Sequence, residues 1–137
     1  MNFSLIEDYA KAAPLSRWLG FSAAPDGDDA IFTLAFAERH IGNVQIRALH
    51  GGVIAAFLEF SAQAALNARL GGAAAIATVN SDIDYISSGR AEDMKARVRF
   101  LRIGRRLAFA EATGWQKDEA SPVAVARFRF RIGEMET

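Results

Sequence analysis

One long apolar segment, residues 53–70, most constrains what this chain can fold into. It is rich in alanine, leucine and phenylalanine, it follows His50-Gly51-Gly52, and it ends at Gly71-Gly72. Glycine pairs of this kind are typical of helix boundaries. A helix that is apolar nearly all round belongs in the interior of a domain. The segment therefore predicts a buried central helix that the rest of the chain must cover.

Strand-like runs flank this helix on both sides. One precedes it, over residues 31–37, and four follow it, over 74–87, 93–103, 105–117 and 122–132. Apolar residues alternate in two of these runs, so each of those strands should have one covered face and one wet face. The breaks between the last four runs are all compatible with hairpins. We therefore expect an α+β fold in which an antiparallel meander packs on the central helix.

The other segments carry weaker signals. Residues 2–12 place apolar side chains at helical spacing and stop near Pro14, and we expect an N-terminal helical segment over about residues 1–20. Residues 38–49 show no clear period and are expected to form a loop. Because no repeat, low-complexity tract or linker interrupts the sequence, residues 1–137 are expected to form a single domain.

The residue types present narrow the possible chemistry. The 137 residues include no cysteine and two histidines, His40 and His50. Thiol catalysis, iron–sulfur clusters and cysteine-based zinc sites are excluded, and a multi-histidine metal site is disfavoured. We therefore expect neither a metal nor a cofactor. Catalysis would have to use carboxylates, hydroxyls, amides, backbone groups or one histidine.

Charge and hydropathy indicate the expected partners and location. The 16 basic and 16 acidic residues balance, whereas a general nucleic-acid binder carries an uncompensated basic face. No signal peptide and no run of ~20 apolar residues is visible, so we expect a cytoplasmic protein that does not enter membranes. A domain without net charge resists self-association poorly, which favours an oligomer.

Glu59 lies in the middle of the apolar helix. An ionised carboxylate is costly to bury unless it is paired, neutralised or placed beside a ligand cavity. Ala55, Glu59, Gln63 and Asn67 follow at every fourth position, so the last three form a polar stripe on the helix. The stripe is either part of a functional site or the one solvent-facing edge of the helix.

The glycines at the start of the helix are the second feature with chemical meaning. Backbone N–H groups left uncovered there suit a carbonyl oxygen that gains negative charge, although a glycine pair also serves as a simple tight turn. Gly51 and Glu59 are eight residues apart, which is about 12 Å along a helix. If both are catalytic, they must meet across a subunit interface.

The segment HGGVIAAFLEFSAQAAL, together with its flanking sequence over roughly residues 20–132, carries a family resemblance. It resembles the hotdog-fold thioesterases of the phenylacetic-acid-degradation (PaaI) type and the related 4-hydroxybenzoyl-CoA thioesterases. The specific element is the HGG followed by an acid on the helix. The resemblance implies a single hotdog domain, in which an antiparallel sheet wraps a long central helix. It further implies a homodimer with a continuous sheet, often doubled to a homotetramer, that hydrolyses acyl-CoA thioesters without a metal.

The resemblance also implies roles for individual residues. The Gly51 N–H would polarise the thioester carbonyl, and Glu59 of the neighbouring subunit would act as nucleophile or general base. Asn43 would be the upstream amide of the site, with Gln45 as its rival. Thr78 matches a hydroxyl position after the helix, unless it is an ordinary β-branched strand residue. His50 would orient the loop rather than act as the base.

The phosphates of CoA call for a local basic cluster, although hairpin arginines are often merely solvated. The residues expected to bind substrate are His50, Gly52, Gln63, Arg90, Arg102, Arg105 and Arg106. An acyl pocket for an aryl or medium-chain group would be lined by aromatic residues that could equally be plain core. These aromatic residues are Trp18, Phe21, Phe57 and Phe60.

Two other functions fit the same resemblance. A non-hydrolytic acyl-CoA-binding or sensing protein would use the same groove, but such a protein has no need of a buried carboxylate at position 59. A dehydratase of this fold would be expected to use a catalytic histidine within a different motif, and neither His40 nor His50 lies in one.

Overall fold

The computed structural model describes residues 2–134. The helices are α1 (Phe3–Ala12), α2 (Pro14–Leu19) and α3 (Gly51–Arg69), with one 3-10 turn, η1 (Glu38–His40). The strands of the main sheet are β1 (Phe21–Asp26), β2 (Asp29–Leu34), β5 (Ala74–Tyr85), β6 (Met94–Ile103), β7 (Leu107–Trp115) and β8 (Ala124–Glu134). A small hairpin contains β3 (Ile41–Asn43) and β4 (Ala48–Leu49).

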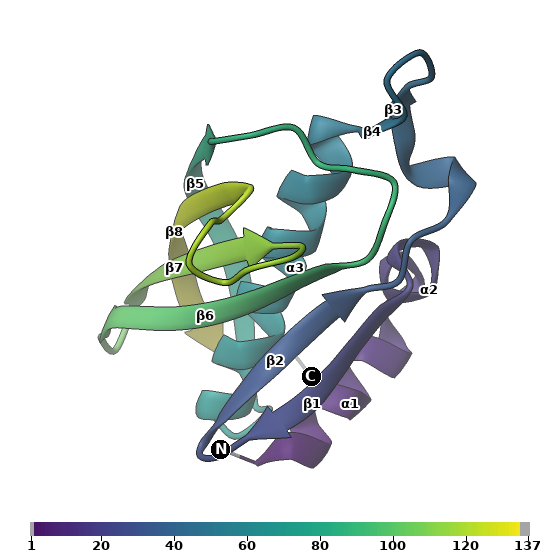
Figure 1. Ribbon diagram of the computed structural model, residues 1–137. Helices are drawn as coiled ribbons and strands as arrows, with labels where there is room; N and C mark the ends of the chain where they lie inside the picture. The colour runs from purple at the N-terminus through teal and green to yellow at the C-terminus, as the bar shows by residue number, and fades with distance from the viewer. Residues whose placement is uncertain (1, 135–137) are drawn as a thin grey trace.

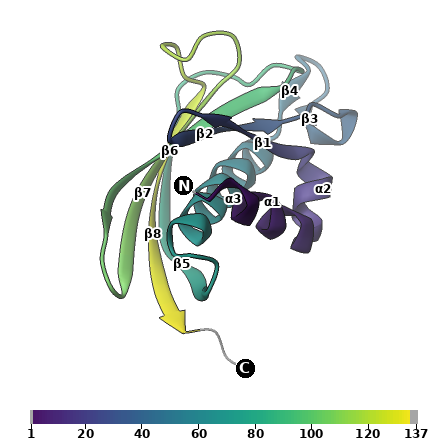
Figure 2. The same cartoon turned by 90° about the horizontal axis from the view of Figure 1, so that it is seen from below.

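The six-stranded sheet is antiparallel and has the order β1-β2-β6-β7-β8-β5. It curls around α3, and α1 and α2 lie on the other side of that helix (Figure 2). The α+β fold with a long helix wrapped by an antiparallel sheet is therefore confirmed. The expected meander holds only for β6, β7 and β8. Because β5 pairs with β8, residues 86–93 form a crossing connection to β6 and not the predicted hairpin (Figure 1).

The central helix is buried along most of its surface. Its most enclosed side chains include Phe57, Leu58 and Leu66. The partly exposed edge of α3 contains Glu59, Gln63 and Asn67, so the polar stripe coincides with the one edge that the described chain leaves open. The strands that pack on α3 alternate as their sequences predict, with alanine, valine and phenylalanine facing inward and arginine facing outward.

The first strand was not predicted. β1 pairs with β2 along its whole length and forms one edge of the sheet. Its sequence, FSAAPD, has no strong alternation and contains Pro25, a residue that sheets tolerate at edges. Gly20 makes the turn into β1 with φ of 67°, and a Cβ there would lie 2.9 Å from the Ala35 carbonyl oxygen.

The expectation of an irregular loop over residues 38–49 is wrong. η1 leads into the β3–β4 hairpin, which projects from the body of the protein (Figure 1). His40 anchors this segment and is fully buried. Its Nδ1 accepts from the Ala37 N–H, and its Nε2 lies 2.9 Å from the Trp18 carbonyl oxygen, to which it donates. The His40 carbonyl in turn accepts from the His50 N–H, which ties the hairpin to the start of α3.

Replacing the His40 ring should therefore destabilise the protein. We expect His40→Leu to lower the free energy of unfolding by about 1–3 kcal/mol, because the Ala37 N–H would be left without a partner and the Trp18 carbonyl would keep only the hydrogen bond from Arg39 Nε. Urea denaturation followed by circular dichroism measures this difference. A loss below about 0.5 kcal/mol, the range of neutral surface substitutions, would show that the ring does not anchor the segment.

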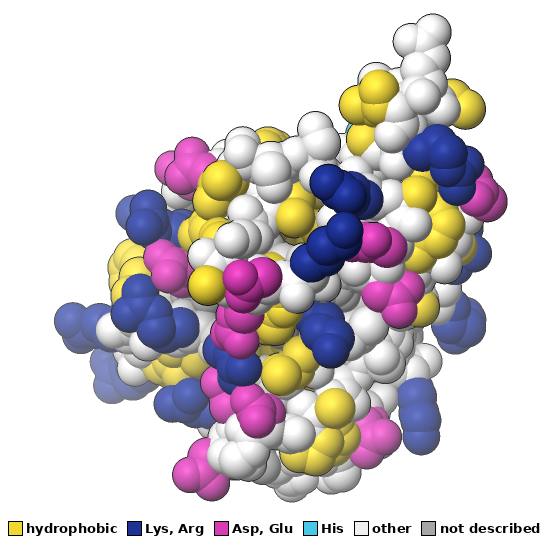
Figure 3. All heavy atoms as spheres, viewed as in Figure 1, with side chains coloured by type: hydrophobic (Ala, Val, Ile, Leu, Met, Phe, Trp, Pro, Cys, Tyr) yellow, Lys and Arg dark blue, Asp and Glu magenta, His cyan; other side chains and the backbone are white. Residues whose placement is uncertain are grey.

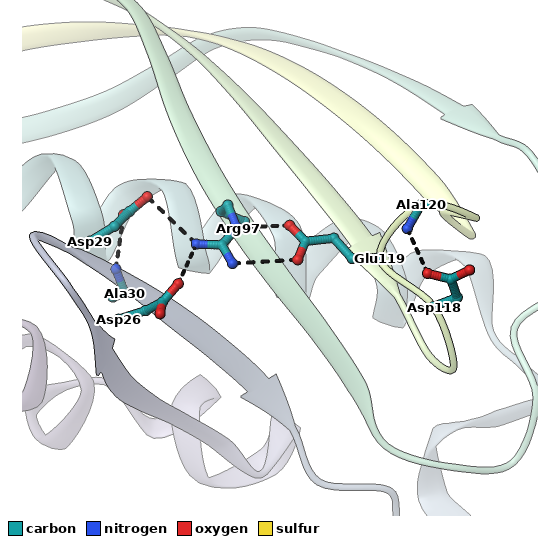
Figure 4. A network of polar contacts seen from close by, with 7 residues as sticks. All are labelled: Asp26, Asp29, Ala30, Arg97, Asp118, Glu119 and Ala120. Carbon is teal, nitrogen blue, oxygen red and sulfur yellow. Dashed lines mark hydrogen bonds and ion pairs between the residues drawn. The ribbon is translucent and has the colours of Figure 1, made fainter.

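A polar network joins the turns on the outer face of the sheet (Figure 4). Arg97 of β6 bonds to Glu119 in the β7–β8 connection and to Asp26 at the end of β1, both at 2.8 Å. These two hydrogen bonds raise the pKa of Arg97, so the guanidinium stays charged. Acidic and basic side chains are interspersed over this face (Figure 3).

Among residues 2–134, every helix is too short or too polar to cross a membrane.

Candidate active site

The first turn of α3 presents one free backbone donor. The Gly52 N–H donates to His50 Nδ1 at 2.8 Å, and the N–H groups of Val53 and Ile54 donate to the His50 carbonyl at 3.0 and 3.2 Å. Within the described chain the Gly51 N–H has no acceptor. It lies at the positive end of a 19-residue helix, where an oxygen that gains negative charge is stabilised.

His50 is the N-cap of α3. Its Nδ1 accepts a hydrogen bond from Gly52, so in the neutral ring the proton is on Nε2. The ring therefore orients the first turn of α3 through Nδ1, which is not free to act as a base. A Cβ at Gly42 would lie 2.7 Å from the His50 Cα, so only glycine allows the β3–β4 hairpin to approach this cap so closely.

Tyr85, at the end of β5, is a part of this site that sequence reasoning missed. Its hydroxyl donates to the Gly51 carbonyl at 2.8 Å, and a Cβ at Gly51 would meet its ring at 3.5 Å. The two residues share the wall of a cavity of about 410 Å³ with Ile54 and Ile86. Tyr85 thus connects the end of the sheet to the helix start, through a contact between residues 34 positions apart.

Glu59 lies two turns further along α3, on its partly exposed edge. Burial raises the pKa of its carboxyl group above the usual range of a glutamate. Tyr9 of α1 packs on the adjacent Phe60, with ring centroids 5.4 Å apart. Burial, and secondarily the charge of Glu59, raises the pKa of Tyr9, which places its phenol in the electrostatic range of the carboxylate. Sequence periodicity places Tyr9 on the apolar side of the N-terminal helix but does not connect it to Glu59, because that proximity depends on how α1 packs on α3.

Two other predicted residues, Gln63 and Thr78, are in contact. The Gln63 side-chain amide donates to the Thr78 hydroxyl oxygen at 3.2 Å. Gln63 follows Glu59 by one helical turn, so their side chains are neighbours on the same edge. Thr78 lies in β5 directly before a β-bulge, where Val79 is the extra residue opposite β8. Bulges of this kind re-aim side chains and often accompany functional sites.

The structure does not bring the predicted upstream amides into contact with these groups. The Asn43 carboxamide oxygen accepts from the backbone N–H groups of Gln45 and Ile46, at 3.1 and 3.4 Å, and so shapes the tip of the β3–β4 hairpin. Gln45 is exposed at the same tip. Within residues 2–134, no hydrogen bond joins either side chain to Glu59, Gln63 or Thr78.

The predicted arginines lie at two opposite ends of the sheet. Arg90 bridges to Ala48 of β4, close to the start of α3. Arg102, Arg105 and Arg106 lie at the β6–β7 hairpin, at the other end of the same strands (Figure 1). They do not form one basic cluster within a single chain.

The aromatic residues proposed for an acyl pocket divide into two groups. Phe57 and Phe60 are 0% and 4% exposed, so in the described structure they are core residues and not pocket walls. Trp18 is 44% exposed and its ring lies 5.2 Å from that of His40. Phe21 is half-buried and packs edge-on against Phe60, with ring centroids 4.8 Å apart.

The candidate residues of the described chain therefore form two separate groups, named half-sites below. The first is the free Gly51 N–H with Tyr85, and the second is Glu59 with Gln63 and Thr78. Eight residues of helix separate Gly51 from Glu59, about 12 Å along the axis, so they cannot act on one atom from the same chain. Within residues 2–134 no group of three or more histidine and carboxylate side chains gathers as a set of metal ligands.

The comparisons with known proteins identify the family and the fold of the chain. The family model of the thioesterase superfamily matches residues 47–123, which include Gly51, Glu59 and Thr78. The chain belongs to the thioesterase superfamily.

Solved structures with the same fold cover almost the whole chain. A protein from Chromobacterium violaceum is 30% identical, with 97% of this chain and 96% of that one covered and a TM-score of 0.75. A thioesterase from Haemophilus influenzae is 18% identical (96% and 92% covered, TM-score 0.83). A phenylacetic acid degradation-related protein from Ralstonia eutropha is 19% identical (93% and 98% covered, TM-score 0.78). No curated protein matches the sequence.

Proposed function

We propose that this protein hydrolyses acyl-CoA thioesters with an aryl or medium-chain acyl group, at a site shared by two copies of the chain. The observation that carries the proposal is the Gly51 N–H, which has no acceptor within the described residues and lies on the same helix as a partly buried carboxylate. Membership of the thioesterase superfamily supports the same reaction class.

Thioester hydrolysis at this site would use one hydrogen-bond donor for the carbonyl oxygen and one carboxylate. The thioester carbonyl oxygen accepts from the Gly51 N–H, which stabilises the negative charge that develops when the acyl carbon is attacked. Glu59 of the second copy either attacks that carbon directly or takes a proton from the water that does. The carbon–sulfur bond then breaks and CoA leaves as a thiolate, which takes up a proton from Glu59 in the general-base route or from solvent in the nucleophile route. With Glu59 as nucleophile, water hydrolyses the resulting acyl-enzyme anhydride, so both routes release the free acid and regenerate the carboxylate.

The open edge of β5 supports a dimer that would complete this site. β5 has 12 residues and no neighbour on its outer side within the described sheet. A long unprotected edge strand is a template for pairing with another chain, whereas the other edge, β1, has six residues and Pro25. Antiparallel pairing of two β5 strands would make the sheet continuous and set the two α3 helices side by side. Assembly of two such dimers into a tetramer stays a prediction of the resemblance.

The same pairing would bring polar residues from opposite ends of the sheet to one substrate groove of the dimer. It would place the β6–β7 hairpin end of one copy toward the α3 start of the other, so Arg102, Arg105 and Arg106 of one chain would approach Arg90 of its partner. Phosphate groups of CoA would be held there. His50 and Gly52 would shape the thioester end of the groove, and Asn43 or Gln45 would reach the leaving group from the hairpin.

A panel of thioesters tests the proposed function. Benzoyl-, phenylacetyl-, hexanoyl- and octanoyl-CoA would be assayed with the wild-type protein by release of free thiol. We expect saturable turnover of at least one aryl or medium-chain substrate. Saturable binding of these thioesters without any thiol release would replace the enzyme by an acyl-CoA-binding or sensing protein.

The rate of hydrolysis should fall at acid pH. Glu59 must be ionised to act, and burial raises the pKa of its carboxyl group, so kcat/KM should rise with pH through an acid limb that lies above the usual glutamate range. A pH–rate profile between about pH 4 and 8 measures this limb. A limb at or below the usual range would show that another group controls the acid side.

A further inference from the structure

A second cavity lies between α1, α2 and β1, and none of its lining residues belongs to α3. Its volume is about 330 Å³, and Ala10, Phe21 and Ala23 form an apolar part of its lining. Tyr9 and Ala10 are consecutive residues of α1, about 100° apart around the helix axis. Ala10 lines the cavity, whereas Tyr9 packs on Phe60 of α3 and is not part of the lining, and Glu59, Gln63 and Thr78 are not part of it either.

A mostly buried hydroxyl without a protein partner points to where a polar ligand atom could bind in the cavity. Ser16 of α2 lines the cavity and is only 7% exposed. No hydrogen bond within residues 2–134 involves its hydroxyl, and no fully enclosed side-chain oxygen or nitrogen in the described chain lacks a partner. The Ser16 hydroxyl is therefore open to the cavity. A polar group in such a position is satisfied by a ligand atom or by solvent.

The rim of the cavity has a net positive charge. Lys11 and Arg17 line it together with one acidic residue, Glu7. None of the ion pairs in the described chain uses any of these three side chains. Two cations against one carboxylate attract a single negative charge, while the apolar lining attracts a hydrophobic body.

We propose that this cavity binds a small amphipathic carboxylic acid as its anion. The carboxylate would lie at the rim, where Arg17 and Lys11 donate to it and the Ser16 hydroxyl donates to its second oxygen. The hydrocarbon body would lie against Phe21, Ala10 and Ala23. A cavity of about 330 Å³ is at the lower end of the size range of ligand pockets, which suits a phenylalkyl or a short alkyl chain.

Binding of octanoate and 4-phenylbutyrate to the full-length wild-type protein tests this site, by isothermal titration calorimetry and ligand-observed NMR. Each acid is compared with its neutral alcohol, 1-octanol or 4-phenylbutanol. We expect each carboxylate to bind about tenfold or more tightly than its alcohol, because charge-assisted hydrogen bonds distinguish the two. The double variant Lys11→Gln/Arg17→Gln should remove most of this preference, and Lys95→Gln/Lys117→Gln, with the same change of net charge elsewhere, should retain it.

A blocking variant locates the ligand. Ser22 is exposed on β1 and lines the cavity, so Ser22→Phe should fill its mouth without disturbing the core. Ala24, two residues along the same strand face and outside the cavity lining, provides the control Ala24→Phe. We expect the first variant to abolish binding and the second to leave it unchanged, with both folded by circular dichroism.

Four outcomes would overturn the proposal. They are no saturable binding of either acid up to about 10 mM, equal affinity for acid and alcohol, binding that survives Ser22→Phe, and a change of molar mass by sedimentation in Ser22→Phe. The last would identify the occupant as a second copy of this chain. None of these measurements depends on thioester hydrolysis, so the fate of this site and that of the proposed enzyme are decided separately.

Discussion

Glu59→Gln is expected to lower kcat for thioester hydrolysis by about 10³-fold, with the fold and the oligomeric state unchanged. The amide has nearly the same shape as the carboxylate, but it can neither attack an acyl carbon nor take a proton from water, and losses of about 10² to 10⁴ are typical for such groups. Free-thiol release under saturating substrate measures the change. Turnover near that of the wild type would remove Glu59 from the mechanism.

The free energy of unfolding of Glu59→Gln shows whether a loss of activity reflects a loss of folded protein. Burial raises the pKa of Glu59, so its folded pKa lies above its unfolded pKa and ionisation of the group opposes folding as pH rises through that window. Glu59→Gln carries no charge, so we expect it to be at least as stable as the wild type at pH 7. Asn67→Ala, on the same edge of α3 two turns further on, is the control and should retain activity. It shows whether removal of a polar side chain from this edge lowers activity even when the carboxylate of Glu59 is present.

Gly51→Pro is expected to lower kcat/KM by about 10²- to 10³-fold, because it removes the backbone N–H that would stabilise the developing oxyanion. Gly51→Ala keeps the N–H and should remain within a few-fold of the wild type. Assay of the two variants side by side by thiol release separates the contribution of the Gly51 N–H to the rate from the effect of adding a side chain at this position. Equal activity of the two variants would show that the Gly51 N–H is not used.

The local structure makes this comparison clean. Gly51 is the first residue of α3, the position where helices accept proline most readily. His50 before it is extended, with φ of −63° and ψ of 132°, as a residue before proline must be. A Cβ at position 51 would make ordinary contact with Tyr85 at 3.5 Å. Neither variant is therefore expected to disturb folding.

Much of the fold follows from local sequence patterns. The central helix was predicted from its glycine boundaries and apolar surface, and β6 and β8 from alternation, because burial of one face imposes a period on the sequence. β1 was missed because an edge strand has little to bury, and the β3–β4 hairpin because its tip is exposed. The pairing of β5 with β8 joins segments far apart in the sequence, and alternation within a strand shows which face is buried but not which strand lies beside it.

The candidate site divides in the same way. Glycines before a helix and an acid within an apolar helix are local departures from the pattern, so Gly51 and Glu59 could be singled out from the sequence. Tyr85 and Tyr9 reach the site through tertiary packing, and no spacing rule connects them to α3. The turn formed by the Asn43 side chain was also unexpected. An asparagine side chain can accept hydrogen bonds from backbone N–H groups two or three residues on as readily as it can bind a substrate, and the sequence does not distinguish the two.

The central claim, that two chains share each active site, is tested most directly by mixing two inactive variants. Gly51→Pro and Glu59→Gln would be unfolded together, refolded at equal concentrations and assayed for thiol release, with each variant refolded alone as the control. Half of the dimers would then contain one copy of each variant, and one of their two sites would combine an intact Gly51 with an intact Glu59. If each active site is shared by two chains, the mixture should recover about a quarter of wild-type activity. Activity no greater than the average of the two variants alone, with mixed dimers present by native mass spectrometry, would contradict it.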